Sequence, residues 1–233
     1  MNQGKGKAEG SSSHAMEASK KAALQQYLDT DGHFSLVRNF RLADLITISN
    51  GVCASLSIFM SANYLATNDE DYLWSALVLP YLGLTFDFLD GKVARWRNEN
   101  SLADLISFGV APALLAFVVG LRTYLDTVVL TAFICCGLAR LARFNATVAS
   151  VPKDAKGKSK YFEGLPIPTS LLLVAVLTYW TKMGWIHGKE GIPLGTITLW
   201  GSKGGKGEVH LVSAMFGTMA AAMVSKTLRV PKV

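Results

Sequence analysis

Long stretches without charge alternate with short charged connections along most of this chain. A helix needs ~20 apolar residues to cross the hydrocarbon of a bilayer, and several stretches approach that length. They predict six membrane-spanning helices, at about residues 45–66, 73–94, 103–121, 125–146, 165–186 and 209–226. The third is short, because its uncharged part covers only residues 105–121. The pattern therefore predicts an all-α fold, a polytopic membrane bundle.

The beginning of the chain differs from the rest. Residues 1–33 are rich in Gly, Ser, Ala, Lys and Gln and contain no continuous apolar run, which predicts a disordered tail without a signal peptide. Residues 34–46 mix Arg38 and Arg41 with aromatic and aliphatic residues, which is typical of a short amphipathic helix at a membrane surface. Residues 34–233 are predicted to form one membrane domain.

Composition and charge agree with a membrane protein. Half of the residues are apolar, 17% are charged and the mean hydropathy is +0.30. The net charge of +6 would suit nucleic acid, but the basic residues gather at the ends of spans, so we expect membrane lipids and nucleotide phosphate as partners and no nucleic acid. Alternate connections are basic, which places both termini and the end of the second span in the cytosol. Lysines between residues 182 and 206 leave the last two spans the least constrained.

Two carboxylates lie near the end of the second predicted span. At ~100° per residue, Asp87, Asp90, Gly91 and Ala94 share one stripe of a helix, and Arg95 follows. Charged groups are costly inside a bilayer and usually face a water-filled cavity. Aspartates three apart are also common on solvated helix faces. Carboxylates beside very small residues, however, suit a divalent cation and a phosphate that approaches the backbone.

Several runs resemble a known family. The string Asp87-Phe-Leu-Asp90-Gly91-Lys-Val-Ala94-Arg95 has the order D-x-x-D-G-x-x-A-R, which is similar to the signature of the CDP-alcohol phosphatidyltransferases. Three later runs resemble the phosphatidylserine synthase branch, especially its fungal-type members: residues 101–113 (S-L-A-D-L-I-S-F-G-V-A-P-A), residues 136–145 and residues 157–169. The resemblance covers about residues 34–180.

The resemblance implies an activity and a set of site residues. Such an enzyme transfers a phosphatidyl group from CDP-diacylglycerol to L-serine and releases CMP, at the cytosolic face of the endoplasmic reticulum. By resemblance, Asp87 and Asp90 would hold Mg²⁺ or Mn²⁺, and Asp104 would be the general base for the serine hydroxyl. A homodimer is also implied. The residues expected to contact the nucleotide and its phosphates are Gly91, Ala94 and Arg95.

Three other polar residues inside predicted spans are candidates for substrate contacts. Arg140 and Arg143 lie three apart on the fourth span, with Gly137 opening space one turn before Arg140. They either reach lipid headgroups from a helix end or hold an anion, which would be the serine carboxylate or a lipid phosphate. Asn50, next to Gly51, either lines the nucleotide pocket or is a satisfied buried amide.

Part of the family signature is missing. The family pattern continues after the arginine with eight residues, a glycine and two further aspartates at intervals of four. Here the spacing from Arg95 to Asp104 is about eight residues too short, and Asn100 occupies the position four before Asp104. Glu99 is one position out of register, and an amide brings no charge to a cation. The sequence therefore predicts weakened metal binding and turnover. The alternatives are another alcohol acceptor, inositol or glycerol phosphate, or a catalytically impaired variant that keeps the lipid-binding fold.

Other residue types show no pattern of a site. The three cysteines lie inside predicted spans, which favours packing over disulfides. The four histidines are scattered without metal-ligand spacing and receive no role. The run Gly201–Gly207 lacks the order of a phosphate-binding loop, so it is predicted to be a flexible connection.

Overall fold

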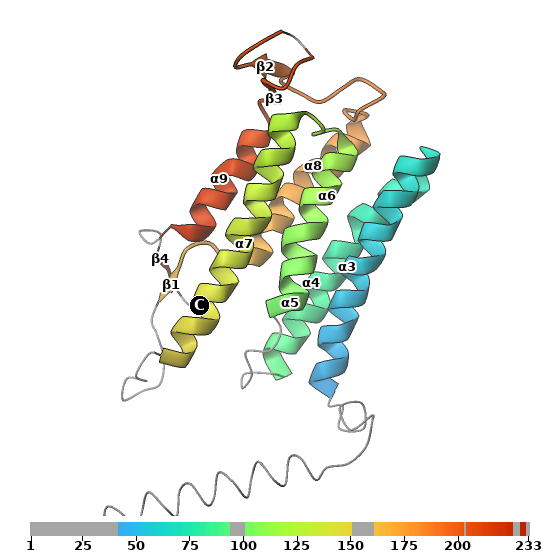
Figure 1. The fold of residues 1–233 in the computed structure, drawn as a ribbon. Helices are drawn as coiled ribbons and strands as arrows, with labels where there is room; N and C mark the ends of the chain where they lie inside the picture. The colour runs from blue at the N-terminus through green and yellow to red at the C-terminus, as the bar shows by residue number, and fades with distance from the viewer. Residues whose placement is uncertain (1–41, 94–100, 151–160, 203, 226–228, 232–233) are drawn as a thin grey trace, which may run out of the picture. The chain divides into compact units, whose positions relative to one another are not determined.

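Helices account for most of the computed structural model, which describes residues 42–93, 101–150, 161–202, 204–225 and 229–231. The predicted tail 1–33 and residues 34–41 of the predicted surface helix lie outside the described residues, and residues 42–46 belong to α3. Figure 1 shows the helices running roughly side by side. They are α3 (Leu42–Thr67), α4 (Glu70–Val93), α5 (Ser101–Leu105), a π-helical turn (Ile106–Val110), α6 (Ala111–Val119), α7 (Tyr124–Ser150), a 3₁₀ turn (Ile167–Ser170), α8 (Leu171–Met183) and α9 (Ser213–Val224).

A helix forms at each of the six predicted spans, which confirms the mostly helical fold. Within the described residues, four stretches are long and apolar enough to cross a membrane: Leu45–Thr67, Glu70–Leu89, Leu102–Val119 and Tyr124–Arg143. The last two helical segments, Ile167–Met183 and Ser213–Val224, are shorter. Helix α9 has 12 residues, which at ~1.5 Å per residue is well short of the ~30 Å hydrocarbon thickness. The chain is an integral membrane protein with four clear candidate spans.

The segment Leu102–Val119 is the centre of the bundle. Within its window 56% of the residues are buried, against 28% for each of the other three candidate spans. It packs against α4, α7 and α8. On the other side of α7, the rings of Phe133 and Phe216 meet edge to face at 5.4 Å and join α7 to α9. A helix surrounded in this way can hold polar side chains at fixed positions away from lipid.

A π-helical turn interrupts this central helix between α5 and α6. The backbone N–H of Ala111 donates to the carbonyl of Ile106, five residues earlier. Pro112 follows at the start of α6 and has no N–H to donate. Ser107, Phe108 and Gly109 of the turn are buried. Single π turns inside α-helices are frequent at functional sites, and this one begins two residues after Asp104.

Two short antiparallel strand pairs, which the sequence pattern did not predict, join connections outside the helices. β1 (Tyr161–Glu163) pairs with β4 (Arg229–Pro231), and β2 (Thr196–Thr198) pairs with β3 (Glu208–His210). The run predicted to be a flexible connection, Gly201–Gly207, lies in the turn between β2 and β3, where the N–H of Leu199 donates to the carbonyl of Gly207 at 2.8 Å. This connection is therefore a hydrogen-bonded hairpin.

Candidate active site

The signature residues gather at one end of the bundle. Asp87 and Asp90 lie one turn apart on the last two turns of α4, and Asp104 lies on α5, which begins after the undescribed residues 94–100. Figure 1 shows the end of α4 and α5 at the same end of the helices. The side chain of Asp87 is half-buried.

Several predicted nucleotide contacts lie beyond what the structure describes. For Asp90 and Gly91 it describes the helical backbone alone, and Ala94 and Arg95 fall outside the described residues. Among the described residues, no three His, Cys, Asp or Glu side chains are close enough to hold a metal ion. The described part of the set, Asp87 and Asp104, offers carboxylate oxygens, which are the ligands that Mg²⁺ and Mn²⁺ prefer. The predicted metal site stays a prediction.

Asp104 of α5 has a charge partner on α7. Helix α5 packs against α7, and the charges of Asp104 and Arg140 interact. Asp104 Oδ1 and Arg140 Nε are both buried. Because an isolated charge is costly to bury, each of these groups makes the other's burial tolerable. The structure thus brings together the predicted general base and one of the two predicted serine-binding arginines.

The two arginines have different surroundings. Arg140 is half-buried and faces α5, whereas Arg143 is exposed and its Nη1 lies 3.4 Å from the carbonyl oxygen of Val224, at the end of α9. The Nε of Arg140 makes no hydrogen bond within the described part of the chain. Arg140 is therefore the better placed of the two to receive an anion beside Asp104.

The sequence suggested that Gly137 opens space one turn before Arg140. The structure shows that this space is filled. A Cβ atom at Gly137 would lie 3.1 Å from Cδ1 of Ile167 and 3.9 Å from Cδ1 of Leu105. The glycine instead allows α7 to approach α5 and the 3₁₀ turn closely. Close packing of this kind fixes the distance between the helices that carry Arg140 and Asp104.

Asn50 is buried at a junction of three helical elements. Its side-chain Oδ1 accepts a hydrogen bond of 2.8 Å from Ser107 Oγ in the π-helical turn. Gly83 of α4 lies against the same oxygen, and a Cβ there would be only 2.7 Å away. The amide oxygen is therefore satisfied and joins α3, α4 and the π turn. A contact between Asn50 and the nucleotide stays a prediction.

The sequence reasoning missed Ser107 and Gly83. Ser107 lies in the run that carried the family resemblance, but nothing in the sequence indicated its partner, because Asn50 and Ser107 are 57 positions apart. Gly83 interrupts an apolar helix, where glycine usually has a packing reason. That signal could have pointed to a close contact.

A second charged contact lies at the other end of α7. Asp126 is fully buried: its Oδ1 accepts from the backbone N–H of His210 at 3.0 Å, and its Oδ2 lies 2.5 Å from His210 Nδ1. The N–H of Thr123 also donates to Oδ2, and Thr123 Oγ1 accepts from the N–H of Asp126. This reciprocal pair resembles a capping box, a signal readable from T-x-x-D. No sequence signal pointed to His210, which had been given no role.

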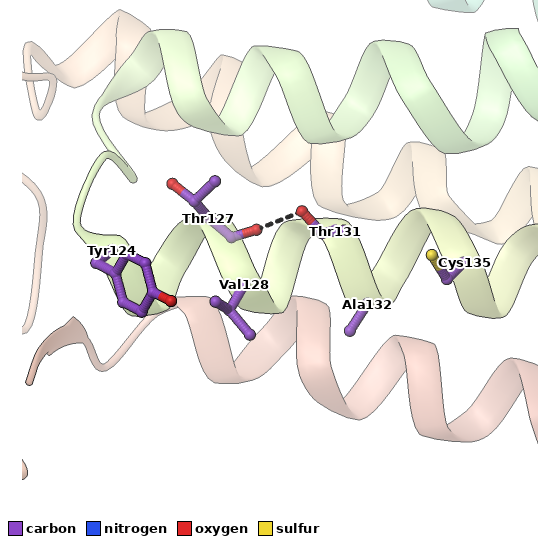
Figure 2. Close-up of a pocket in the computed structure, with 6 residues that line it drawn as sticks. All are labelled: Tyr124, Thr127, Val128, Thr131, Ala132 and Cys135. Atoms are coloured by element: carbon purple, nitrogen blue, oxygen red, sulfur yellow. Dashed lines mark hydrogen bonds between the residues drawn. The ribbon is translucent and has the colours of Figure 1, made fainter. Parts of the chain in front are cut away.

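A groove of 360 Å³ runs along α7, away from the signature residues (Figure 2). Its lining is almost wholly apolar, and its two threonines bond to their own helix: Thr127 Oγ1 donates to the carbonyl of Thr123, and Thr131 Oγ1 to that of Thr127. The other polar groups in the lining are the Tyr124 hydroxyl and the Cys135 thiol, which bring no charge to a nucleotide phosphate, so this groove suits lipid contact. It is lined by Tyr124, Thr127, Val128, Thr131, Ala132 and Cys135.

Comparisons with known proteins agree with the signature. The family model described as CDP-alcohol phosphatidyltransferase matches residues 40–204. The chain is 44% identical over 218 residues to the CDP-diacylglycerol-serine O-phosphatidyltransferase of Saccharomyces cerevisiae, covering 90% of this chain and 77% of the yeast protein. The 218 aligned positions exceed 90% of a 233-residue chain, so the yeast protein has residues without a counterpart here, in agreement with the shortened motif.

Two prokaryotic proteins are also similar. An archaetidylserine synthase of Methanothermobacter thermautotrophicus is 34% identical over 145 residues, which cover 58% of this chain and 56% of that protein. A CDP-diacylglycerol-serine O-phosphatidyltransferase of Bacillus subtilis is 32% identical over 145 residues, which cover 58% of this chain and 73% of that protein. Together with the signature on α4 and α5, these matches show that the chain belongs to the CDP-alcohol phosphatidyltransferase family.

Proposed function

We propose that this protein transfers the phosphatidyl group of CDP-diacylglycerol to L-serine, giving phosphatidylserine and CMP. The observation that carries the proposal is the electrostatic interaction between Asp104, the last aspartate of the signature, and Arg140, on two helices that pack against each other. The yeast relative, a serine-specific transferase by name, supports the choice of acceptor. The proposal places the enzyme in the endoplasmic reticulum membrane, with this end of the bundle facing the cytosol.

In the proposed reaction, Asp104 removes the proton from the serine hydroxyl. The hydroxyl oxygen forms a bond to the phosphorus that carries diacylglycerol, and the bond from that phosphorus to the CMP oxygen breaks. Arg140 pairs with an anionic group of the substrates, the serine carboxylate or a lipid phosphate, because a guanidinium can bind such groups through two parallel hydrogen bonds. The buried surroundings of both side chains strengthen these interactions.

A divalent cation, Mg²⁺ or Mn²⁺, belongs to this proposal. Asp87 and Asp90 would hold it, and when bound it would offset the negative charge that develops on the pyrophosphate oxygens. Gly91 and Ala94 would let the nucleotide approach the helix backbone, and Arg95 would contact phosphate. The proposal also includes assembly as a homodimer.

A second candidate follows from the missing part of the signature. Asn100 occupies the position where the family has its third aspartate. A family member with one carboxylate fewer would bind the cation more weakly, since cation affinity depends on ligand charge and number. The chain would then be a catalytically impaired variant that keeps the lipid-binding fold.

One assay separates these functions. Microsomes that contain this chain, in a host without the activity, are given CDP-diacylglycerol, Mn²⁺ and labelled serine, inositol or glycerol phosphate. Labelled phosphatidylserine supports the leading proposal, and product with another alcohol alone contradicts it. If no acceptor gives product, a chain with the eight missing residues restored is tested in parallel. Serine transfer by the restored chain alone supports the impaired variant.

A further inference from the structure

The hairpin formed by β2 and β3 exposes large apolar side chains. Leu194 is 74% exposed, Leu199 62%, Trp200 57% and Ile197 43%. The hairpin lies in the connection between α8 and α9 (Figure 1). Exposed apolar groups gathered in one connection usually mark a surface that contacts a partner or a membrane.

The strand register places two of these residues, Ile197 and Leu199, on one face. Ile197 pairs directly with Val209, and side chains alternate along a strand, so Leu199 and Leu211 extend the same face. The opposite face is polar: Thr196 pairs with His210, and Thr198 with Glu208. Through His210, this polar face is fastened to Asp126 of α7. The apolar face is therefore the one turned away from that attachment.

The turn of the hairpin is held in shape by its own hydrogen bonds. Glu208 accepts a bond from Thr196 Oγ1 at 2.5 Å and one from the N–H of Gly204 at 2.7 Å. The carbonyl of Trp200 lies so close to Gly207 that a Cβ there would overlap it. A loop that is already ordered loses little conformational entropy on contact with a partner.

The connection that contains the hairpin meets the helices where they reach the membrane boundary. The N–H of His187 donates to the carbonyl of Val119, the last residue of one candidate span, and His210 binds Asp126, near the first residue of the next. Other large apolar or aromatic side chains are exposed on the elements next to the hairpin: Leu211 just before α9, Met215 in α9 and Tyr124 at the start of α7. Tryptophan and tyrosine favour this boundary, where an apolar ring meets water and headgroups.

From these observations we propose that the β2–β3 hairpin lies in the lipid headgroup region, with Ile197 and Leu199 inserted among the upper acyl chains. The occupant of the apolar face is thus lipid, because hydrogen bonds hold this connection at the ends of two candidate spans, where the bilayer surface begins. Lys206, exposed in the turn, would remain at the headgroups.

Such an anchor has a use in this fold. Helix α9 has 12 residues and cannot span the hydrocarbon core, so its own length does not fix how deep it lies in the bilayer. The hairpin directly precedes α9. At the far end of α9, the carbonyl of Val224 contacts the side chain of Arg143, on the same helix α7 as Arg140. An interfacial hairpin would fix the depth of α9 and thereby support α7 near the candidate site.

Neighbouring positions on opposite faces of β2 provide the test. In the full chain with its three native cysteines replaced by alanine, Leu199→Cys and Thr198→Cys are each labelled with a small environment-sensitive fluorophore and reconstituted in phosphatidylcholine and phosphatidylserine vesicles. We expect lipids with a spin label high on the acyl chain to quench the label at position 199 at least twice as strongly as that at 198. We expect aqueous iodide to show the reverse order.

Three outcomes would overturn the proposal. The label at 199 could be quenched by iodide and not by lipid, which would place the hairpin in water. It could be protected from both quenchers, which would indicate a protein partner or a second copy. Equal lipid quenching at 198 and 199 would contradict the assigned face. Size-exclusion elution that matches the unlabelled chain shows that each variant is folded, and none of these readouts depends on the transferase activity.

Discussion

Helix α7 makes a contact between a carboxylate and a base near each of its ends, and the two contacts differ. At the start of α7, Asp126 has hydrogen bonds on both oxygens, from Thr123 and from His210. Toward the other end, Arg140 faces Asp104, yet its buried Nε makes no hydrogen bond with any described residue. A buried donor without a partner costs free energy. The hydrogen bonds of the first pair are satisfied within the fold, whereas the second pair leaves the Arg140 Nε donor for the substrate anion of the proposed function.

The strongest test of this difference exchanges each carboxylate for an amide. Asp104→Asn should lower the rate of phosphatidylserine formation on the order of 10³-fold, because it removes a general base. Asp126→Asn should leave the rate nearly unchanged and lower the unfolding temperature instead. Initial rates in proteoliposomes and thermal unfolding in detergent measure the two effects. Equal losses of activity in both variants would show that the two contacts do not differ in role.

Restoring the shortened signature should sharpen the comparison further. Inserting the eight missing residues, with an aspartate four positions before Asp104, should raise turnover and lower the Mn²⁺ concentration needed for half-maximal activity, each ~10–100-fold. Losing a residue that only supports a metal ligand has an effect of this size, so restoring a ligand should have at least as large an effect. The matched control carries the same insertion with asparagine at that position. If the control gains as much as the aspartate version, spacing and not charge limits this chain. Neither change should affect the contact at Asp126.

The two arginines of α7 provide the next test. Arg140→Lys keeps the charge beside Asp104 but loses the planar guanidinium, so it should raise the KM for serine ~10-fold, about 1.4 kcal/mol. Arg143→Lys, at an exposed position, should change it less than twofold. Rates as a function of serine concentration distinguish them. A larger effect at Arg143 would move the anion site toward the end of α9.

The sequence predicted the helices better than it predicted their contacts. Uncharged runs placed all six helices because exclusion from water depends on local composition. The π turn, the contact of Asn50 with Ser107 and the hairpin between α8 and α9 depend on partners distant in the chain. The sequence indicated Asp104 and Arg140 as candidates, but only the packing of α5 on α7 showed that their charges interact. Gly137 shows the same limit: the sequence suggested open space, and close packing fills it.

The junction of Asn50 with Gly83 and Ser107 gives a further test, in which the expected effect is a modest change in folding stability. Gly83→Ala would place a methyl group 2.7 Å from Asn50 Oδ1, which should destabilise the fold by ~1–3 kcal/mol. In an Asn50→Ala background the same change should be neutral or stabilising, because alanine is the better helix former. A double-mutant cycle from thermal unfolding measures this coupling. Additive effects would contradict the contact.

The smallest expected effect on catalysis lies at the opposite end of α7. His210→Ala removes the side-chain partner of Asp126 but leaves the backbone bonds, so it should cost ~1–3 kcal/mol of folding stability through an incompletely satisfied buried carboxylate. His187→Ala is the matched control, because His187 is exposed and its bond to Val119 comes from the backbone. Below the unfolding temperature both variants should turn over substrate like the parent chain. A selective loss of turnover in His210→Ala would show that this end of the bundle acts on the reaction, and the division between a structural and a chemical end of α7 would then fail.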